Sequence, residues 1–236
     1  MMQLRQETDE ARTDWEVLEE SLSLDGMTIV ELGCGPGLLT RAIAGTGTGR
    51  QILALEVDEV QHARNARITD LPNVEFGLAG AESIPCDDGT VDLALMFKSL
   101  HHVPTELVDQ AMAEIHRVLV PSGHLHVSEP VFDGVFNEVL RLFHDEERQR
   151  AAAFEALTRA VDRGLFELVR QTFFLAPVYF PSFEAFEHKI IDATHTEHRL
   201  SDTLHAQVKA RFEAHLGAVG ALFLQPTRVD LLRSRS

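Results

Sequence analysis

The sequence has few of the features that mark secreted, membrane-spanning or nucleic-acid-binding proteins. Only two cysteines, Cys34 and Cys86, occur among its 236 residues, which is too few for a disulfide framework and typical of reduced thiols in the cytoplasm. No stretch approaches the roughly 18 apolar residues that a membrane span needs. Residues 1–20 are polar and acidic, unlike a signal peptide. We therefore expect a cytoplasmic protein with no membrane span.

Basic residues are also scarce, because 21 Lys and Arg stand against 37 Asp and Glu, giving a net charge of −16. The acidic excess is concentrated in residues 1–130, which hold 22 of the acidic and 8 of the basic residues. Nucleic-acid backbones are bound by clustered Lys and Arg, so we expect no nucleic-acid partner. The share of apolar residues, 44%, is ordinary for a globular protein with a substantial core.

The most informative stretch is an apolar run that ends in three alternate glycines, Gly33, Gly35 and Gly37. A helical pattern follows directly, which predicts a buried parallel strand over residues 27–32 that enters a helix through a tight turn. Glycine lets the backbone take left-handed angles and lie close against a ligand. The first N–H groups of the helix have no partner within it. The turn is therefore a candidate ligand site.

Three interpretations of this turn are open. The dinucleotide fingerprint G-x-G-x-x-G needs a third glycine where this chain has Leu38, which argues against a nicotinamide-dependent dehydrogenase. Glu31, two residues before the first glycine, favours a cationic ligand and repels a diphosphate. The third interpretation is a turn that joins strand to helix and binds nothing.

A second apolar run, over residues 51–57, is typical of a strand that is covered on both faces. It ends in Glu56, Val57 and Asp58. An acid about 20 residues beyond a glycine turn, at the end of the second strand, can accept hydrogen bonds from both hydroxyls of a ribose. Glu56 and Asp58 are the candidates, and a charged strand end that faces solvent is the alternative.

Four segments resemble, in order, the motifs of the class I S-adenosylmethionine (SAM)-dependent methyltransferases. E-L-G-C-G-P-G at 31–37 resembles their first motif, and residues 79–92 resemble the third, usually G-D-A-E-x-L-P-F followed by a turn and F-D. L-H-H-V at 100–103 recurs in the branch that methylates small molecules and quinones. R-V-L-V-P-S-G at 117–123 is similar to R-V-L-K-P-G-G. The resemblance covers roughly residues 27–130.

The resemblance implies SAM as the cofactor and Glu56 as the acid that binds its ribose. The chain departs from the family at Gly80, where the family has the aspartate that accepts the adenine amino group. Either Glu82 or the main chain takes over this hydrogen bond, or the affinity falls. The residues implied to bind SAM are Glu31, Gly33, Cys34, Gly35, Gly37, Glu56, Val57, Gly80, Ala81, Glu82, Phe97 and Lys98.

Two side chains are candidates for a catalytic base, His102 after the fourth strand and Glu129 at the end of the fifth. An imidazole titrates near neutrality, and open α/β sheets bind ligands at the carboxyl edge where both residues would lie. A histidine bonded to the backbone and a plain acid at a strand end are the alternatives. We expect no bound metal, since His195 and His198 do not form an H-E-x-x-H motif.

The second half of the sequence differs in character, because it holds 12 of the 14 phenylalanines. Two helical runs, about 132–143 and 148–162, are predicted to form an insertion over the cleft. Strand-like runs follow at 165–180 and at 221–232, the latter interrupted by Pro226.

Alternating helices and strands predict an α/β fold with a doubly wound sheet. The resemblance implies a mostly parallel, Rossmann-like sheet of seven strands with a helical cap. We divide the chain into an N-terminal lid helix (1–24), a SAM-binding core (25–130), a helical cap and substrate region with a late strand (131–200), and a final helix with the last sheet strand (201–236).

The function that the resemblance implies is methyl transfer from SAM to a small-molecule acceptor, at oxygen, nitrogen or carbon. A SAM-binding protein without transferase activity, acting as a sensor or partner module, is the alternative. The sequence names neither the acceptor nor the oligomeric state, and a homodimer stays open.

Overall fold

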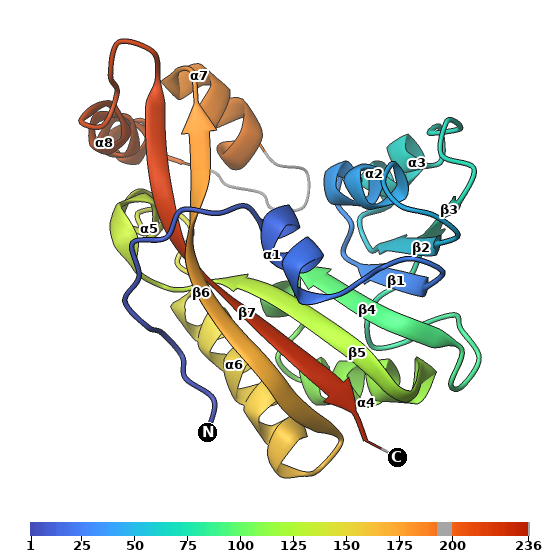
Figure 1. Cartoon of the computed structure of the whole chain (residues 1–236). Coiled ribbons are helices and arrows are strands. Elements are labelled where there is room, and N and C mark those ends of the chain that lie inside the picture. Colours follow the sequence, from blue (N-terminus) through green and yellow to red (C-terminus); the bar gives the residue numbers. More distant parts are fainter. Residues whose placement is uncertain (193–199, 236) are drawn as a thin grey trace.

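The computed structural model describes residues 1–192 and 200–235, which build one seven-stranded sheet flanked by helices (Figure 1). The strand order is β3-β2-β1-β4-β5-β7-β6. Neighbouring strands from β3 to β5 run parallel, whereas β7 runs antiparallel to both β5 and β6. The predicted doubly wound, mostly parallel seven-stranded sheet is therefore confirmed.

The strands are β1 (Thr28–Leu32), β2 (Gln51–Glu56), β3 (Val74–Leu78), β4 (Val91–Phe97), β5 (Leu119–Pro130), β6 (Phe166–Phe180) and β7 (Ala221–Ser234). The helices are α1 (Asp14–Ser21), α2 (Leu38–Ala44), α3 (Glu59–Asn65), α4 (Val108–Val118), α5 (Gly134–Leu140), α6 (Glu147–Asp162), α7 (Phe183–Phe186) and α8 (Asp202–Glu213), with the short helical turns η1 (Leu100–His102) and η2 (Glu187–Ile191). Among the described residues, every helix is too short or too polar to cross a membrane.

Successive side chains of the central strands pack against helices on opposite faces of the sheet. On β1, Ile29 lies in a core with Leu18 of α1 and Ile43 of α2. Val30 lies instead in the core that includes Ile115 of α4 and Leu157 of α6. Because a strand directs alternate side chains to opposite faces, a strand covered on both sides is apolar throughout.

The position of α6 differs from the predicted one. The sequence predicts that the helical run over 148–162 lies over the cleft, but Ala153, Ala156 and Leu157 pack in the main core with α4 and the sheet. An amphipathic pattern identifies the apolar face of a helix. It does not identify the surface that covers that face.

β7 continues through Pro226, where the sequence predicts an interruption. The carbonyl of Pro226 accepts the N–H of Val131 (2.8 Å), so this residue directs its backbone groups toward the β5 side. β5 stops pairing at Pro130 opposite Thr227. The absent N–H of Pro226 therefore costs the sheet no hydrogen bond, which is the condition under which strands tolerate proline.

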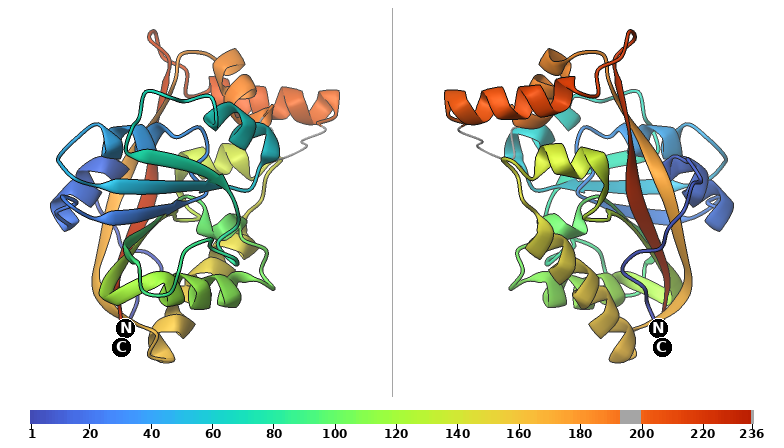
Figure 2. Two further views of the ribbon diagram at one scale, coloured as in Figure 1. Left: turned by 90° about the vertical axis from the view of Figure 1, so that its right-hand side faces the viewer. Right: turned by 90° about the vertical axis from the view of Figure 1, so that its left-hand side faces the viewer.

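Beyond the end of β5, strands β6 and β7 continue as a two-stranded ribbon that carries a helical cap (Figures 1 and 2). α5, α7, η2 and α8 gather around this ribbon. Phe136 of α5, Phe186 of α7 and Phe212 of α8 meet Phe180 and Phe223 of the two strands in one buried core. Many of the phenylalanines in the second half of the chain are thus the core of the cap.

The cap core yields a prediction about stability. Phe186 is fully buried, and its ring lies 5.0 Å from that of Phe212 and 5.3 Å from that of Phe180. We expect Phe186→Ala to lower the free energy of unfolding by about 3–5 kcal/mol, because it removes a large buried ring and leaves a cavity. Urea denaturation followed by circular dichroism measures the change. The control is Leu222→Ala, at a side chain that is 61% exposed. Equal effects of both substitutions would show that the cap core adds little to stability.

Candidate functional site

A cavity of about 760 Å³ lies at the carboxyl edge of the parallel strands. It is lined by the turn after β1, the end of β2, the segment after β3 and the end of β4. The predicted cofactor residues in its wall are Glu31, Gly33, Cys34, Gly35, Glu56, Val57, Gly80, Ala81, Glu82, Phe97 and Lys98.

Gly37 is the one predicted cofactor residue outside this wall. It is the N-cap of α2, with a φ of +71°, and a Cβ at this position would lie 3.3 Å from the ring of Phe76. The glycine is therefore explained by the conformation of the turn and its packing, since a left-handed N-cap favours glycine.

The turn after β1 is shaped by close packing and by backbone hydrogen bonds. The N–H groups of Gly33 and Cys34 both donate to the carbonyl of Leu55 at 2.9 Å, which joins the ends of β1 and β2. A Cβ at Gly33 would lie 2.6 Å from Cβ of Ser99. At Gly35, by contrast, a Cβ would project into open space. Packing against Ser99 thus requires a glycine at position 33, whereas the absence of a side chain at Gly35 keeps space open in the cavity.

Glu31 and Cys34 are buried groups whose ionisation is suppressed. Burial raises the pKa of the Glu31 carboxyl to about 7, although the hydroxyl of Thr40 donates to it at 2.6 Å and opposes the shift. Burial, together with the charges of Glu31 and Glu56, raises the pKa of the Cys34 thiol to about 12. Cys34 is therefore a poor nucleophile, while Glu31 can ionise near neutral pH.

The structure distinguishes the two acids that follow β2. The carboxylate of Glu56 accepts hydrogen bonds from the N–H groups of Gly35 (2.8 Å), Val57 (2.8 Å) and Asp58 (3.0 Å). Asp58 instead caps α3 and accepts the N–H of Val60 at 2.8 Å. Glu56 is thus the acid that is held against the glycine turn.

The segment after β3 shows what stands in place of the aspartate at Gly80. A Cβ built on Gly80 would overlap the carboxylate of Glu82. The Glu82 carboxylate therefore occupies the space that a side chain at position 80 would fill.

A second, smaller cavity of about 280 Å³ adjoins the first, and the side chains of Lys98 and His102 line both. Lys98 directly follows β4 and has a left-handed φ of +55°, and its Nζ lies 3.4 Å from Asp14 of α1. Most of the remaining wall comes from the cap and from α6. It combines apolar and polar side chains, namely Phe136, Leu140, Val178, Phe180 and Ile190 with His101, His144, Glu146, Arg150, Lys189 and Gln225.

The two predicted catalytic residues lie in different environments. His102 has a side chain that is 45% exposed, at the boundary of the two cavities. Glu129 is 3% exposed and lines neither cavity. Its carboxylate accepts the backbone N–H of Leu100 (2.9 Å) and pairs with Nδ1 of His101.

The His101–Glu129 pair is a coupled, buried ion pair. Burial alone would lower the pKa of His101, but Glu129 and Glu146 raise it to about 9. Burial would raise the pKa of Glu129, yet the charge and hydrogen bond of His101 hold it below its ordinary value. The pair is therefore charged at neutral pH, and Glu129 is occupied by an internal partner.

Sequence reasoning missed Glu146. The L-H-H-V segment draws attention to both His101 and His102, of which His102 is the candidate base. Glu146 comes from the turn before α6 and has no local sequence signal.

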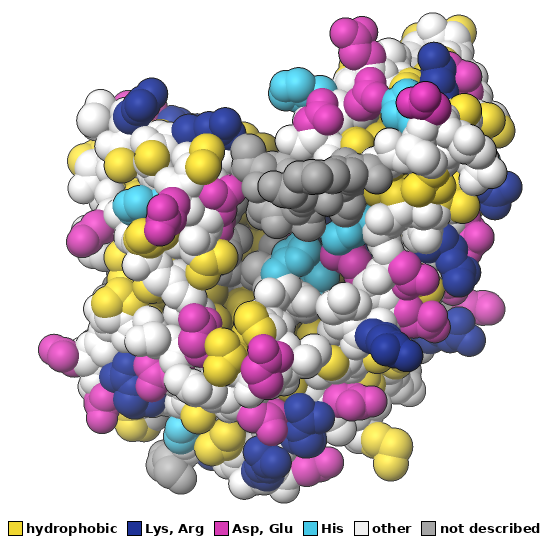
Figure 3. Space-filling view, turned by 180° about the vertical axis from the view of Figure 1, so that it is seen from behind, with side chains coloured by type: hydrophobic (Ala, Val, Ile, Leu, Met, Phe, Trp, Pro, Cys, Tyr) yellow, Lys and Arg dark blue, Asp and Glu magenta, His cyan; other side chains and the backbone are white. Residues whose placement is uncertain are grey.

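Figure 3 shows histidine side chains gathered in a hollow at the centre of one face of the molecule. Of the histidines considered as metal ligands, His195 and His198 lie outside the described residues.

Comparisons with known proteins agree with this geometry. Residues 30–127 match the family model described as a methyltransferase domain. A protein of Mycobacterium tuberculosis named as a probable S-adenosylmethionine-dependent methyltransferase is 31% identical over 156 residues, 63% of this chain and 52% of that protein. A ubiquinone/menaquinone biosynthesis C-methyltransferase of Hydrogenovibrio crunogenus is 34% identical over 109 residues, 44% of this chain and 42% of the enzyme. The chain thus spans about half the length of the curated relatives it matches.

Solved structures share the fold at lower identity. A SAM-dependent methyltransferase of Aquifex aeolicus superimposes with a TM-score of 0.55 at 22% identity, covering 68% of this chain and 83% of the enzyme. The [4+2]-cyclase SpnF superimposes with a TM-score of 0.60 at 23% identity, covering 93% and 79%. One fold therefore carries more than one chemistry, and the site must distinguish them.

The buried Glu31 leads to a prediction about pH. A raised pKa means that the folded chain holds the proton more tightly than the unfolded chain, whose glutamate titrates near 4.5. The protonated form of Glu31 stabilises the folded chain fully below about pH 4.5, and this contribution to the free energy of unfolding is lost as the pH rises through 7. Compared with wild type, we expect Glu31→Gln to be more stable at pH 8 by about 2–3 kcal/mol and little changed at pH 5.

Urea denaturation at the two pH values measures this difference, with Glu19→Gln, at an exposed glutamate, as the control. A gain that is the same at pH 5 and pH 8 would contradict the assignment of a raised pKa to Glu31.

Proposed function

Residues 30–127 form a domain of the methyltransferase family, and from that premise we propose that the protein transfers the methyl group of SAM to a small-molecule acceptor. The observation that carries the proposal is the cavity at the carboxyl edge of the sheet, whose wall holds eleven of the twelve residues implied by the family motifs. Open α/β sheets bind their ligands at this edge.

The wall of the large cavity fits SAM in size and in charge. Its volume of about 760 Å³ is within the range of small-molecule sites. Carboxyl groups stand on its wall at Glu31, Glu56 and Glu82, which suits a ligand that carries a sulfonium and an amino group. We assign Glu31 to the amino-acid end, Glu56 to the ribose and Glu82 to the adenine.

The bound cofactor would supply an activated methyl group on a positively charged sulfur, so the protein needs chiefly to align an acceptor and exclude water. We assign alignment to the side chains at the boundary of the two cavities, Lys98 and His102. Because His102 lines both cavities and Glu129 lines neither, His102 is the better placed candidate for a general base.

The acceptor would occupy the smaller cavity, between the cap and α6. A volume of about 280 Å³ admits a small molecule. Its wall of phenylalanine and aliphatic side chains suits an apolar body, and its charged and imidazole groups suit a polar end.

A SAM-binding protein without transferase activity is the second candidate function. The observation that favours it is the pairing of Glu129 with His101, which leaves one of the two predicted bases engaged. Single-turnover incubation with SAM and a pool of metabolites separates the two functions. A mass gain of one methyl group in any metabolite supports the transferase, and its absence while SAM binds supports the sensor.

Titration calorimetry with SAM and with its demethylated product tests the cofactor site. We expect one equivalent of each to bind, and we expect Glu56→Gln to weaken both by about 10–100-fold, because a charged hydrogen-bond acceptor contributes about 1.5–3 kcal/mol. Glu59→Gln, at an exposed neighbour, is the control and should leave the affinity unchanged. If neither ligand binds the wild-type protein, the proposed function is wrong.

The role of Glu82 is tested by moving its carboxylate back to position 80. Glu82→Ala removes the group that would accept the adenine amino group, and we expect SAM affinity to fall by about 10–100-fold. The double variant Gly80→Asp/Glu82→Ala places an acid in the space that Glu82 vacates, and we expect it to recover most of the lost affinity in the same calorimetric titration.

Two results would contradict this assignment. Wild-type affinity in Glu82→Ala would mean that the adenine is held by the main chain alone. A double variant that binds no better than Glu82→Ala would mean that the carboxylate contributes through contacts other than the shared position.

A further inference from the structure

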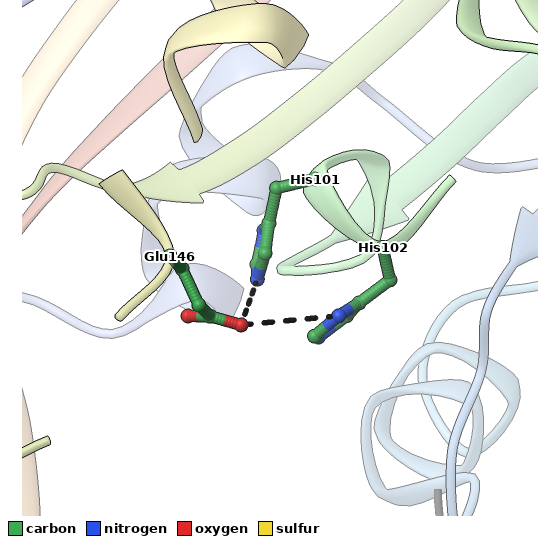
Figure 4. A group of neighbouring side chains, drawn as sticks. All are labelled: His101, His102 and Glu146. Atoms are coloured by element: carbon green, nitrogen blue, oxygen red, sulfur yellow. Dashed lines mark ion pairs between the residues drawn. The ribbon is translucent and has the colours of Figure 1, made fainter. Parts of the chain in front are cut away.

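Three side chains that could bind a metal ion converge at the boundary of the two cavities. His101 and His102 come from η1, and Glu146 comes from the turn before α6 (Figure 4). Oε1 of Glu146 lies 3.4 Å from Nε2 of His101 and 3.9 Å from Nδ1 of His102. One ligand atom from each of the three residues lies within 4.8 Å of the others.

These separations are close to those of a metal site. Zinc lies about 2.0–2.2 Å from imidazole nitrogen and carboxylate oxygen atoms in tetrahedral sites, so two ligand atoms on one ion lie about 3.3–3.6 Å apart. The separation of 3.4 Å between Glu146 and His101 agrees with this value. The side chain of His102 would have to move a few tenths of an ångström closer to Glu146.

The surroundings of His101 are those of an oriented ligand. Its Nδ1 faces the carboxylate of Glu129, which is itself buried and held by the N–H of Leu100. This contact directs Nε2 toward Glu146. Metal-binding histidines characteristically donate their other ring N–H to a carboxylate in this way, which sets the tautomer and the ring orientation.

Glu146 is also held in place by its neighbours. Arg150 Nη2 lies 2.7 Å from its Oε2, which leaves Oε1 toward the histidines. Nε2 of His144 lies 2.7 Å from the same Oε1. The smaller cavity, which His101, His102 and Glu146 all line, provides a path for an ion to enter.

We propose that His101, His102 and Glu146 bind a divalent transition metal ion at the boundary of the cofactor and acceptor cavities, with the ion displacing the proton from Nε2 of His101 to solvent. Two imidazoles and one carboxylate suit zinc, iron or nickel better than magnesium, which prefers oxygen ligands. The side that faces the smaller cavity leaves a coordination position open. This further step rests on the proposed function: with the ion bound, His102 is a ligand, and the ion would take over its proposed role by binding an oxygen atom of the acceptor at the open position and lowering the pKa of a hydroxyl there. The site would thus select acceptors with a hydroxyl or carboxylate group.

The test uses the full-length chain without a histidine tag, stripped of metal by chelation and titrated with Zn²⁺ in a calorimeter. We expect one equivalent to bind with high affinity to wild type, and we expect this binding to be lost in both His102→Asn and Glu146→Gln. Glu129→Gln should weaken it by about 10–100-fold, because only the orienting contact is lost. His215→Asn, at an exposed histidine of the cap region, is the matched control and should bind like wild type.

Visible absorption of bound Co²⁺ gives a second readout, since its intense d–d bands report coordination by the protein in a tetrahedral or five-coordinate site, and these bands should disappear in the two ligand variants. His102 is partly exposed, so His102→Asn is expected to fold, and circular dichroism checks this. Absence of Zn²⁺ binding to wild type, or binding that both ligand variants retain, would overturn the proposal. Because no SAM is present, the result is independent of the titration that tests the proposed function.

Discussion

The carboxylate of Glu56 is the interaction on which the geometry of the large cavity depends. It stands at the end of β2 and accepts the N–H of Gly35 in the turn after β1, while the carbonyl of Leu55 accepts the N–H groups of Gly33 and Cys34. Two adjacent parallel strands are thereby joined at their ends through the turn itself. The backbone of the turn stays bare toward the cavity because Gly35 has no side chain to fill it.

A second set of buried polar contacts joins the sheet to the part of the chain that follows it. Glu129 at the end of β5 pairs with His101 of η1, which faces Glu146, and Arg150 of α6 secures Glu146. Removing one partner of a buried ion pair is costly because it leaves an uncompensated charge. The wall between the two cavities is therefore built from mutually dependent groups, with His102 as its exposed member.

Local sequence patterns predicted much of the fold, and long-range contacts account for what they missed. The strand, glycine turn and helix around Gly33 were predictable because each is specified by neighbouring residues. The spacing to that turn predicted an acid at Glu56 or Asp58, and the family resemblance favoured Glu56. By contrast, Glu146 lies 45 positions after His101 in the sequence, and nothing in its own neighbourhood marks it. The location of α6 likewise depends on the surface that covers its apolar face. The continuity of β7 through Pro226 depends on the end of β5, which stops pairing opposite Thr227.

The site consists of two cavities that are formed by different parts of the chain. The large cavity is formed by the parallel strands and their turns, which the solved methyltransferase and the [4+2]-cyclase SpnF share as a fold. The small cavity is formed by the cap and α6, where the chain is richest in phenylalanine. Since a shared scaffold does not determine a reaction, we propose that the choice of acceptor lies with the second cavity. Among the described residues, His102 and Lys98 line both cavities, so under the proposed function they would set the position of the acceptor relative to the cofactor.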